Sequence, residues 1–209
     1  GRLIRHELCH LDFRFRKKCI AVNWFLASVI VKSDLRKSQL NRRLHLPQDE
    51  YLDRSKKIQR NIVESEIFHE ANLIACYLPI KNEVDTSYII KSCFDLNKLI
   101  VLPKIISNSM VFTLHKVDDT FVVNKFGIKE IDNEEISVND IELFICPCLA
   151  YNKSGNRLGY GGGYYDKALS SSGAKKIGIA FELQKLSFDS EPHDIPMDYI
   201  CNENGLFAC

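Results

Sequence analysis

Short apolar runs alternate with stretches of helical spacing from about residue 32 to residue 181. An apolar run bounded by turn residues is typical of a strand that is buried on both faces. This pattern predicts strands over residues 73–78, 99–102, 143–149 and 176–181, the first two ending at Pro79 and Pro103. Apolar spacing, with proline and acids at one helix start, predicts helices over residues 33–44, 47–67, 86–94 and 165–170. Residues 111–115 alternate like an edge or hairpin strand, and residues 116–140 are mixed and loop-rich.

Strands that alternate with helices indicate a three-layer α/β/α domain with a mainly parallel, Rossmann-like central sheet. In such sheets, ligands bind beyond the carboxyl ends of the strands. The segment that follows residues 143–149 is rich in glycine. Its place in the chain therefore suits a ligand site.

Residues 1–31 differ from the rest of the chain, because a basic stretch precedes an apolar run over residues 19–31. The run is too short for a membrane span, which needs roughly 20 apolar residues. The pattern also lacks the small-residue cleavage site of a signal peptide. We expect residues 1–31 to be a leader that is disordered or not native, and residues 32–209 to form the folded domain. A transit peptide is the alternative, and it would place the protein in mitochondria instead of the cytoplasm.

The composition is that of an ordinary globular protein, with 45% hydrophobic residues, 26% charged residues and a formal net charge of +1. This charge gives no basic field for nucleic acid, and we expect no nucleic-acid or membrane partner. The chain has eight cysteines but no Cys-x-x-Cys pair. We therefore expect free thiols in a reducing compartment, without a disulfide framework or a zinc site.

The most informative segment runs from Arg157 to Asp166 and reads Arg-Leu-Gly-Tyr-Gly-Gly-Gly-Tyr-Tyr-Asp. Glycine permits positive φ and lets backbone N–H groups approach a ligand, and successive N–H groups in a tight turn make an anion site. Arg157 adds a charge-assisted bond to phosphate, and Asp166 offers oxygen to a hard cation. The segment matches neither a P-loop nor Gly-x-Gly-x-x-Gly. We interpret it as a metal–nucleotide site, the alternative being a flexible surface loop.

Three further segments carry charges that suit such a site, and each has a plain structural alternative. Lys32 and Arg36 are four residues apart and share a helical face, which either grips a polyphosphate or is simply solvated. Glu83 follows a predicted strand and either accepts hydrogen bonds from a heterocycle or favours a helix N-terminus. Asp194 either joins Asp166 on Mg²⁺ or lies in a rigid, proline-framed turn.

Two adjacent tyrosines, Tyr164 and Tyr165, close the glycine-rich segment. A tyrosine ring stacks on a ligand or anchors a loop in the core, and alternation predicts one of each. No Ser–His–Asp or Cys–His set stands out, and a lone loop histidine such as His193 is more often a hydrogen-bonding residue than a base. Any chemistry is therefore expected to work by placing two reactants and neutralising charge.

Taken together and in order, these motifs resemble the 5-formyltetrahydrofolate cyclo-ligase family, also called methenyltetrahydrofolate synthetase. The resemblance covers residues 32–207. It rests on Lys32-Ser-Asp-Leu-Arg36 with Arg42-Arg43, residues 75–86 around Glu83, Pro147-Cys-Leu-Ala-Tyr151, Gly155 with Arg157–Asp166, and the closing segments 177–184 and 192–194.

The resemblance implies an ATP- and Mg²⁺-dependent closure of 5-formyltetrahydrofolate to 5,10-methenyltetrahydrofolate, with release of ADP and phosphate. The formyl oxygen would be phosphorylated, and the folate's own N10 would then attack the activated carbon, without a covalent enzyme intermediate. The implied ATP contacts are Lys32, Ser33, Asp34, Leu35, Arg36, Arg157, Leu158, Gly159, Tyr160, Gly161, Gly162, Gly163, Tyr164 and Tyr165. The implied folate contacts are Arg36, Leu78, Glu83, Tyr160 and Tyr164, the Mg²⁺ ligands are Asp166 and Asp194, and Arg157 and Tyr164 position the reactants and stabilise charge. We also expect a cytoplasmic monomer.

The sequence departs from the family pattern in two places. Tyr151-Asn152 stands where the family often has an aspartate, which removes one charge near the glycine-rich segment. Gly127-Ile-Lys-Glu130-Ile131 stands where Gly-Ile-x-Glu-Pro is common, and we expect a less rigid loop there.

Two other hypotheses compete with the cyclo-ligase. One is a non-catalytic nucleotide- or RNA-binding relative of the same fold, and the other is a sugar-phosphate isomerase-like enzyme. The first is disfavoured by the presence of Lys32, Arg36, Glu83, Arg157, Tyr164, Asp166 and Asp194. The second gives no reason for the basic helix that starts at Lys32.

Overall fold

The computed structural model describes residues 32–124, 127 and 129–209, so the expected leader over residues 1–31 lies outside the described residues. The chain divides into two units, Gly1–Ser38 and Gln39–Cys209. The described part of the first unit, residues 32–38, is helical, and the second unit opens with helical residues 39–44. The helix predicted over residues 33–44 is therefore confirmed.

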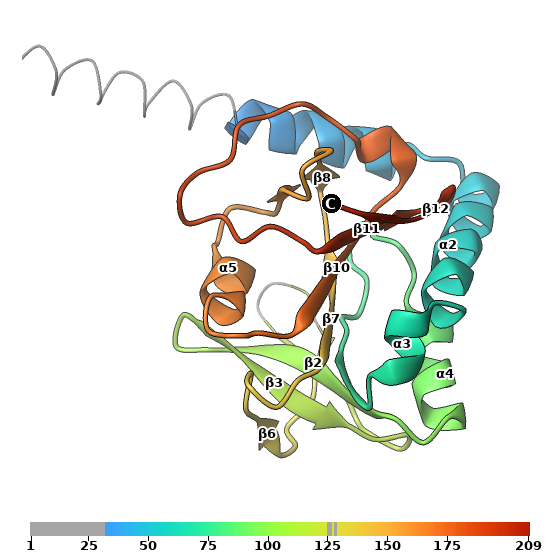
Figure 1. The fold of residues 1–209 in the computed structure, drawn as a ribbon, viewed down its shortest axis with the longest axis vertical. Helices are drawn as coiled ribbons and strands as arrows, with labels where there is room; N and C mark the ends of the chain where they lie inside the picture. Colours follow the sequence, from blue (N-terminus) through green and yellow to red (C-terminus); the bar gives the residue numbers. More distant parts are fainter. Residues whose placement is uncertain (1–31, 125–126, 128) are drawn as a thin grey trace, which may run out of the picture. The chain divides into compact units, whose positions relative to one another are not determined.

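Among the described residues, an eight-stranded sheet has the order β12-β11-β10-β7-β1-β2-β3-β6 (Figure 1). Parallel pairing joins β11 (Tyr199–Asn202), β10 (Lys175–Ile179), β7 (Leu143–Pro147), β1 (Leu73–Ala75) and β2 (Leu99–Ile106). Antiparallel strands lie toward the edges, namely β12 (Gly205–Ala208) on one side and β3 (Ser109–His115) and β6 (Glu135–Ile136) on the other. Short ladders join β4 (Val122–Val123) to β5 (Lys129–Glu130), and β8 (Ala150–Tyr151) to β9 (Arg157–Leu158).

Helices cover both faces of the sheet (Figure 1). One side carries α2 (Gln48–Val63), α3 (Glu66–Glu70) and α4 (Ser87–Asp95), and the other carries α5 (Tyr164–Leu169). On α2, Ile58 and Ile62 are buried one turn apart and join the apolar cluster on that side of the sheet. A second cluster packs Leu169 of α5 with Phe144 of β7. The predicted three-layer α/β/α fold with a mainly parallel sheet is therefore confirmed.

Two strand ends differ from the prediction. β1 stops at Ala75, before the expected end at residue 78, because the following residues leave the ladder and approach a turn. β2 continues through Pro103 to Ile106, so the predicted end at this proline is wrong. Beyond Val101 the parallel partner β1 has ended, and β2 pairs with β3 alone. Proline is tolerated in a strand that has no partner on one side.

The helix predicted over residues 47–67 is divided in two at Ser65. The Ser65 hydroxyl accepts a hydrogen bond from the backbone N–H of Phe68 over 3.3 Å and so caps the start of α3. The sequence pattern also did not predict β11 and β12. The cysteines of the described residues are free thiols, and none of the described helices is long and apolar enough to cross a membrane.

Candidate functional site

Strands that follow β1 in the chain are added to the sheet on both sides of β1. The chain passes from β1 to β2 on one side, whereas β7, β10 and β11 follow on the other side. Because β1 and β7 are parallel neighbours, the segments that follow them leave the same edge of the sheet. Ligands of open α/β sheets bind at such a topological switch point. The segment after β1 carries Glu83, and the segment after β7 leads to the glycine-rich turn.

The glycine-rich segment is a turn between β9 and α5. Gly163 is the residue that caps α5, and its φ of 65° is left-handed, a conformation that costs other residues about 1–2 kcal/mol. The ring of Tyr164 packs over Gly162, whereas Tyr165 packs against the apolar cluster on the α5 side. Tyr165 therefore anchors the turn, and Tyr164 covers Gly162.

Arg157 lies beneath this turn and is only 8% exposed. Its Nη2 donates a hydrogen bond to Asp166 Oδ1 at 2.9 Å, and its guanidinium carbon lies 5.1 Å from the centroid of the Tyr165 ring. The buried Nε of Arg157 has no hydrogen-bond partner among the described residues. A buried donor without a partner costs about 1–3 kcal/mol. Arg157 thus keeps one buried N–H donor that no described residue satisfies.

The proline-framed segment over residues 191–198 meets the turn at Asp166. The backbone N–H of Ile195 donates to Asp166 Oδ1 over 3.3 Å. One residue earlier, Asp194 Oδ2 accepts from the backbone N–H of Glu191 at 2.7 Å. Possible ligand atoms of Glu191, His193 and Asp194 lie within 4.8 Å of one another. The structure thus groups Asp194 with Glu191 and His193, and bonds Asp166 to Arg157.

Glu83 lies in a polar cluster with Tyr160 and Arg43. Arg43 Nη2 donates to the Tyr160 hydroxyl at 2.5 Å and lies 4.0 Å from Glu83 Oε1. Glu83 Oε2 accepts from the backbone N–H of Ile80 at 3.0 Å. Arg43 and Glu83 are 1% and 4% exposed, whereas Tyr160 is 44% exposed. The cluster therefore joins the segment after β1 to the glycine-rich turn through one half-exposed phenol.

The protonation states in this cluster follow from burial and from the neighbouring charges. Burial raises the pKa of Glu83, and this rise is opposed by the Ile80 N–H, by the charge of Arg43 and by the Tyr160 hydroxyl. Burial together with the negative charge of Glu83 raises the pKa of Tyr160 to about 12. Tyr160 is thus a neutral phenol at physiological pH. Its hydroxyl accepts from Arg43 and keeps a proton to donate.

Arg43 is the site residue that the sequence analysis missed. The motif Arg42-Arg43 supported the family resemblance, but neither residue was given a role in the site. Residues seven apart on a helix share a face, and Arg43 lies seven positions after Arg36. That spacing is the signal that could have found it.

The other predicted ATP contacts near the N-terminus belong to the first unit. Lys32, Ser33, Asp34, Leu35 and Arg36 are helical. Their approach to the glycine-rich turn of the second unit stays a prediction. In the second unit, the predicted folate contact Leu78 is half-buried and packs against the apolar cluster on the α2 side.

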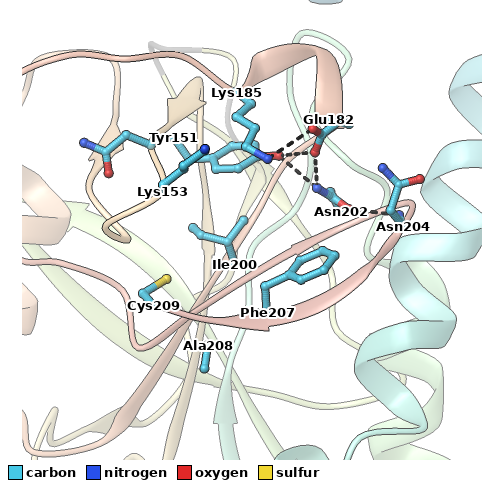
Figure 2. A pocket seen from close by; sticks show the side chains of 11 residues that line it. Tyr151, Lys153, Glu182, Lys185, Ile200, Asn202, Asn204, Phe207, Ala208 and Cys209 are labelled. Carbon is cyan, nitrogen blue, oxygen red and sulfur yellow. Dashed lines mark hydrogen bonds and ion pairs between the residues drawn. The ribbon is translucent and has the colours of Figure 1, made fainter.

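A separate cavity of about 300 Å³ lies beside η1 (Glu182–Gln184), β11 and β12 (Figure 2). Figure 2 shows Tyr151, Glu182 and Asn202 pointing toward one another. The Tyr151 hydroxyl donates to Glu182 Oε2 at 2.7 Å, and Asn202 Nδ2 donates to the Tyr151 hydroxyl at 2.9 Å. These polar groups satisfy one another, and none of the residues that line the cavity is a predicted site residue.

The two departures from the family pattern have defined surroundings. Asn152 Oδ1 accepts from the backbone N–H groups of Ser154 and Asn156, both at 3.0 Å. Its Nδ2 donates to the Phe188 carbonyl at 3.2 Å, a bond that an aspartate carboxylate could not make. Asn152 therefore stabilises its own turn through these hydrogen bonds. Ile131 is 2% exposed and belongs to the core, so apolar packing anchors the end of the loop that we expected to be less rigid.

The fold and the site define a doubly wound α/β protein whose switch point combines a glycine-rich turn with a buried carboxylate. The chain belongs to the 5-formyltetrahydrofolate cyclo-ligase family, which residues 29–203 match. A 5-formyltetrahydrofolate cyclo-ligase of Mycoplasma genitalium is 35% identical over 183 residues, which cover 83% of this chain and 99% of that protein.

Solved structures support the same assignment. The Aquifex aeolicus 5,10-methenyltetrahydrofolate synthetase has a TM-score of 0.77 and 31% identity, and the match covers 85% of this chain and 92% of that one. The Mycoplasma pneumoniae 5,10-methenyltetrahydrofolate synthetase has a TM-score of 0.70 and 30% identity, with 82% of this chain and 98% of that one covered. These relatives are named as enzymes, which favours a catalytic protein over a non-catalytic relative.

Proposed function

We propose that this chain is an ATP- and Mg²⁺-dependent ligase that converts 5-formyltetrahydrofolate into 5,10-methenyltetrahydrofolate, with release of ADP and phosphate. The observation that carries the proposal, besides family membership, is the contact between the glycine-rich turn and Glu83 through Tyr160 and Arg43. One turn thereby serves two ligands. Its Arg157 side is suited to phosphate, and its Tyr160 side is suited to a heterocycle.

On the phosphate side, Arg157 would supply ATP with a fixed positive charge from its buried place at the turn. Its Nη2 is held by Asp166, so the guanidinium keeps a fixed orientation. A preformed cation in a buried place stabilises developing negative charge more strongly than a cation in water. Lys32 and Arg36 would add two further cations from the first unit. The backbone N–H groups of Gly161, Gly162 and Gly163 would complete the phosphate site.

On the folate side, Glu83 would accept hydrogen bonds from the pterin N–H groups. An ionised carboxylate has about four lone-pair positions. The Ile80 N–H occupies one of them, and the Tyr160 hydroxyl approaches another. About two positions therefore remain for a substrate that presents adjacent N–H donors. Tyr164 would lie against the folate from its place above the glycines, and Leu78 would supply an apolar contact.

The donor set near the turn fits a magnesium ion. Asp166 uses Oδ1 for both of its hydrogen bonds, to Arg157 and to the Ile195 N–H, which leaves Oδ2 to a cation. Asp194 precedes Ile195 and would supply the second carboxylate. Mg²⁺ commonly takes one or two protein carboxylates and completes its shell with phosphate and water. When bound, it would neutralise phosphate charge during the transfer.

The chain's own residues would act by positioning and not by covalent attack. Burial raises the pKa of Cys146 and of Cys148 to about 12, so both thiols stay protonated and are poor nucleophiles. The formyl oxygen would receive the terminal phosphate of ATP, and N10 of the same folate would then displace phosphate from the activated carbon. Arg157 and Tyr164 would hold the two reactants in line. Such alignment supplies up to about 7–11 kcal/mol of a barrier.

The test is to mix the purified chain with 5-formyltetrahydrofolate, ATP and Mg²⁺ and to follow the absorbance of methenyltetrahydrofolate. We expect product only when both ATP and Mg²⁺ are present. We expect Asp166→Asn to lower turnover by about 10²-fold or more, since losing one transition-state contact costs 10²–10³-fold in comparable sites. Asp53→Asn is the matched control, because Asp53 is exposed on α2 and forms a surface ion pair with Lys57. Absence of ATP-dependent product from the folded protein would refute the proposal.

A further inference from the structure

Arg43 occupies an unusual place for an arginine, since it is 1% exposed at the junction of three segments. Its Nε donates to the carbonyl oxygen of Lys81 at 3.0 Å, and its Nη2 donates to the Tyr160 hydroxyl at 2.5 Å. The same Nη2 lies 4.0 Å from Glu83 Oε1. All these residues belong to the second unit, Gln39–Cys209. One guanidinium thus contacts both sides of the switch point.

The turn that presents Glu83 has a strained backbone. Lys81 and Asn82 have φ of 49° and 56°, and the Glu83 N–H donates to the Ile80 carbonyl at 2.9 Å. Two positive φ values at the centre of a four-residue turn define type I′, which favours Asn-Gly. Lysine at the first of these positions costs about 1–2 kcal/mol. The bond from Arg43 to the Lys81 carbonyl holds this turn in place.

A buried arginine beside a buried glutamate is weak evidence for stability. The cost of removing both charges from water commonly equals or exceeds their attraction. Strain and buried charge that persist in this way cluster at functional sites. The placement of Arg43 therefore indicates a role in ligand binding.

We propose that Arg43 is a positioning residue for the folate site, which holds Glu83 as an anion and aims it, with Tyr160, at the N–H edge of the pterin. This inference rests on the proposed function. Arg43 itself is covered by its partners and acts through them. It adds specificity, because an anionic acceptor favours a ring that presents N–H donors over one that presents only acceptors.

Some of the other groups around Glu83 favour its ionised form, and others do not. Lys81 is a second cation and favours the anion. Burial, and to a smaller extent the charge of Glu83, raises the pKa of Tyr77, Tyr160 and Tyr165, so these phenols are neutral neighbours at physiological pH. Arg43 is the buried cation of this set, and its loss removes charge compensation that exposed Lys81 replaces only in part.

The experiment measures folate KM, ATP KM and kcat for Arg43→Met and Arg43→Lys across pH 5.5–8.5. Arg42→Met is the matched control, because Arg42 is the exposed neighbour on the same helical stretch. We expect Arg43→Met to raise folate KM by about 10- to 100-fold near neutral pH, the range for a lost charge-assisted bond, with ATP KM changed less than threefold. The penalty should shrink as pH rises, because Glu83 then ionises without Arg43. Arg43→Lys should restore most of the affinity, and the control should match the wild type.

Two further variants separate charge from shape. In the Glu83→Gln background, Arg43→Met should change folate KM little, because the anion that it supports is gone. Asn82→Gly should relieve the backbone strain of the turn. When it is combined with Arg43→Met, it should not return folate KM to the wild-type value. The proposal is overturned in favour of a structural role if Asn82→Gly restores the folate KM of Arg43→Met. It is also overturned if Arg43→Met raises folate KM equally at every pH. If Arg43→Met does not fold, a folate KM in Arg43→Lys that stays about tenfold or more above the wild-type value at every pH decides against it.

The outcomes for Arg43 and for the proposed function are distinguishable. A wild-type protein without ATP-dependent turnover refutes the proposed function. A wild-type protein that turns over normally, together with an Arg43→Met variant whose folate KM and pH profile are unchanged, refutes only the role of Arg43.

Discussion

Replacing Gly155 with alanine tests whether the bend between β8 and β9 and the proline-framed segment depend on one another. Gly155 lies in the bend between β8 and β9, and its carbonyl accepts from the backbone N–H of Met197 at 2.9 Å. An added Cβ would lie 2.5 Å from the Met197 carbonyl oxygen and 2.8 Å from Cys209 Cβ. The Met197 oxygen belongs to the backbone, so it cannot move away as a side-chain tip can. The two segments would have to separate.

The expected loss of stability has two parts. Gly155 has φ of +75°, and alanine there costs about 1–2 kcal/mol. The overlap with the Met197 carbonyl adds about 1–3 kcal/mol, the usual cost of overpacking. The total is about 2–5 kcal/mol, which lowers Tm by roughly 4–20 °C in a domain of this size. Because Met197 follows Asp194 by three positions, we also expect a higher KM for Mg·ATP.

Gly127→Ala is the matched control, because its φ of +76° is nearly the same and no atom of the described residues lies within 4 Å of its added Cβ. It should therefore carry the backbone cost of about 1–2 kcal/mol without the overlap. Unfolding in urea, followed by linear extrapolation, measures both variants. If Gly155→Ala costs no more than Gly127→Ala, the close approach to Met197 does not exist in solution and the reasoning fails.

Three further predictions follow from burial and charge. Because the pKa of Glu83 is raised above its ordinary value of 4.5, its protonated form stabilises the fold below that pH and this gain is lost as pH rises through the folded pKa. Glu83→Gln should therefore have a Tm at pH 7 that equals or exceeds that of the wild type, and this difference should shrink below pH 4.5. Its folate KM should rise. A Tm at pH 7 below that of the wild type contradicts this prediction. Iodoacetamide should label exposed Cys209 but neither Cys146 nor Cys148 in the native protein, as read by mass spectrometry, and rapid labelling of either buried thiol counts against the buried placement. Removal of residues 1–31 should leave kcat and both KM values within twofold of the full chain, and a large loss would show that this segment takes part in the fold or the site.

The fold was predictable from the sequence where local pattern and tertiary packing agree. The strand over 143–147 and the last three residues of the strand over 175–179 are apolar on both faces because helices cover both faces of the sheet, and the apolar runs carry that information. The strand end predicted at Pro103 was wrong, because the cost of a proline in a strand depends on whether a partner strand lies on the side to which its backbone nitrogen points. In β2 that side is vacant beyond Val101, and no local pattern records it.

Candidate site residues could be chosen from the sequence by their chemistry, but their contacts could not be predicted. Arg157, Asp166 and Asp194 stood out because their residue types suit phosphate and magnesium. Sequence could not show that Asp166 accepts hydrogen bonds from Arg157 and from the backbone N–H of Ile195, since the second contact depends on how two loops meet. Arg43 was missed for a related reason. A basic residue on a helix is usually solvated, and only the tertiary fold shows that this one is buried.

The topology places the two parts of the proposed site beside one another. β1 and β7 are neighbours in the sheet although β2 and β3 lie between them in the chain. The loops that follow them therefore meet without a long connection, and Glu83 comes to Tyr160 while Arg157 stays beneath the glycines. A transfer from ATP to folate needs its two reactants in line at a fixed separation. A sheet edge that holds both loops supplies that separation, because the distance between two paired strands is fixed by their hydrogen bonds. Substitutions that loosen the β1–β7 pair should consequently weaken binding of both ligands together, whereas changes at Arg43 should affect the folate alone.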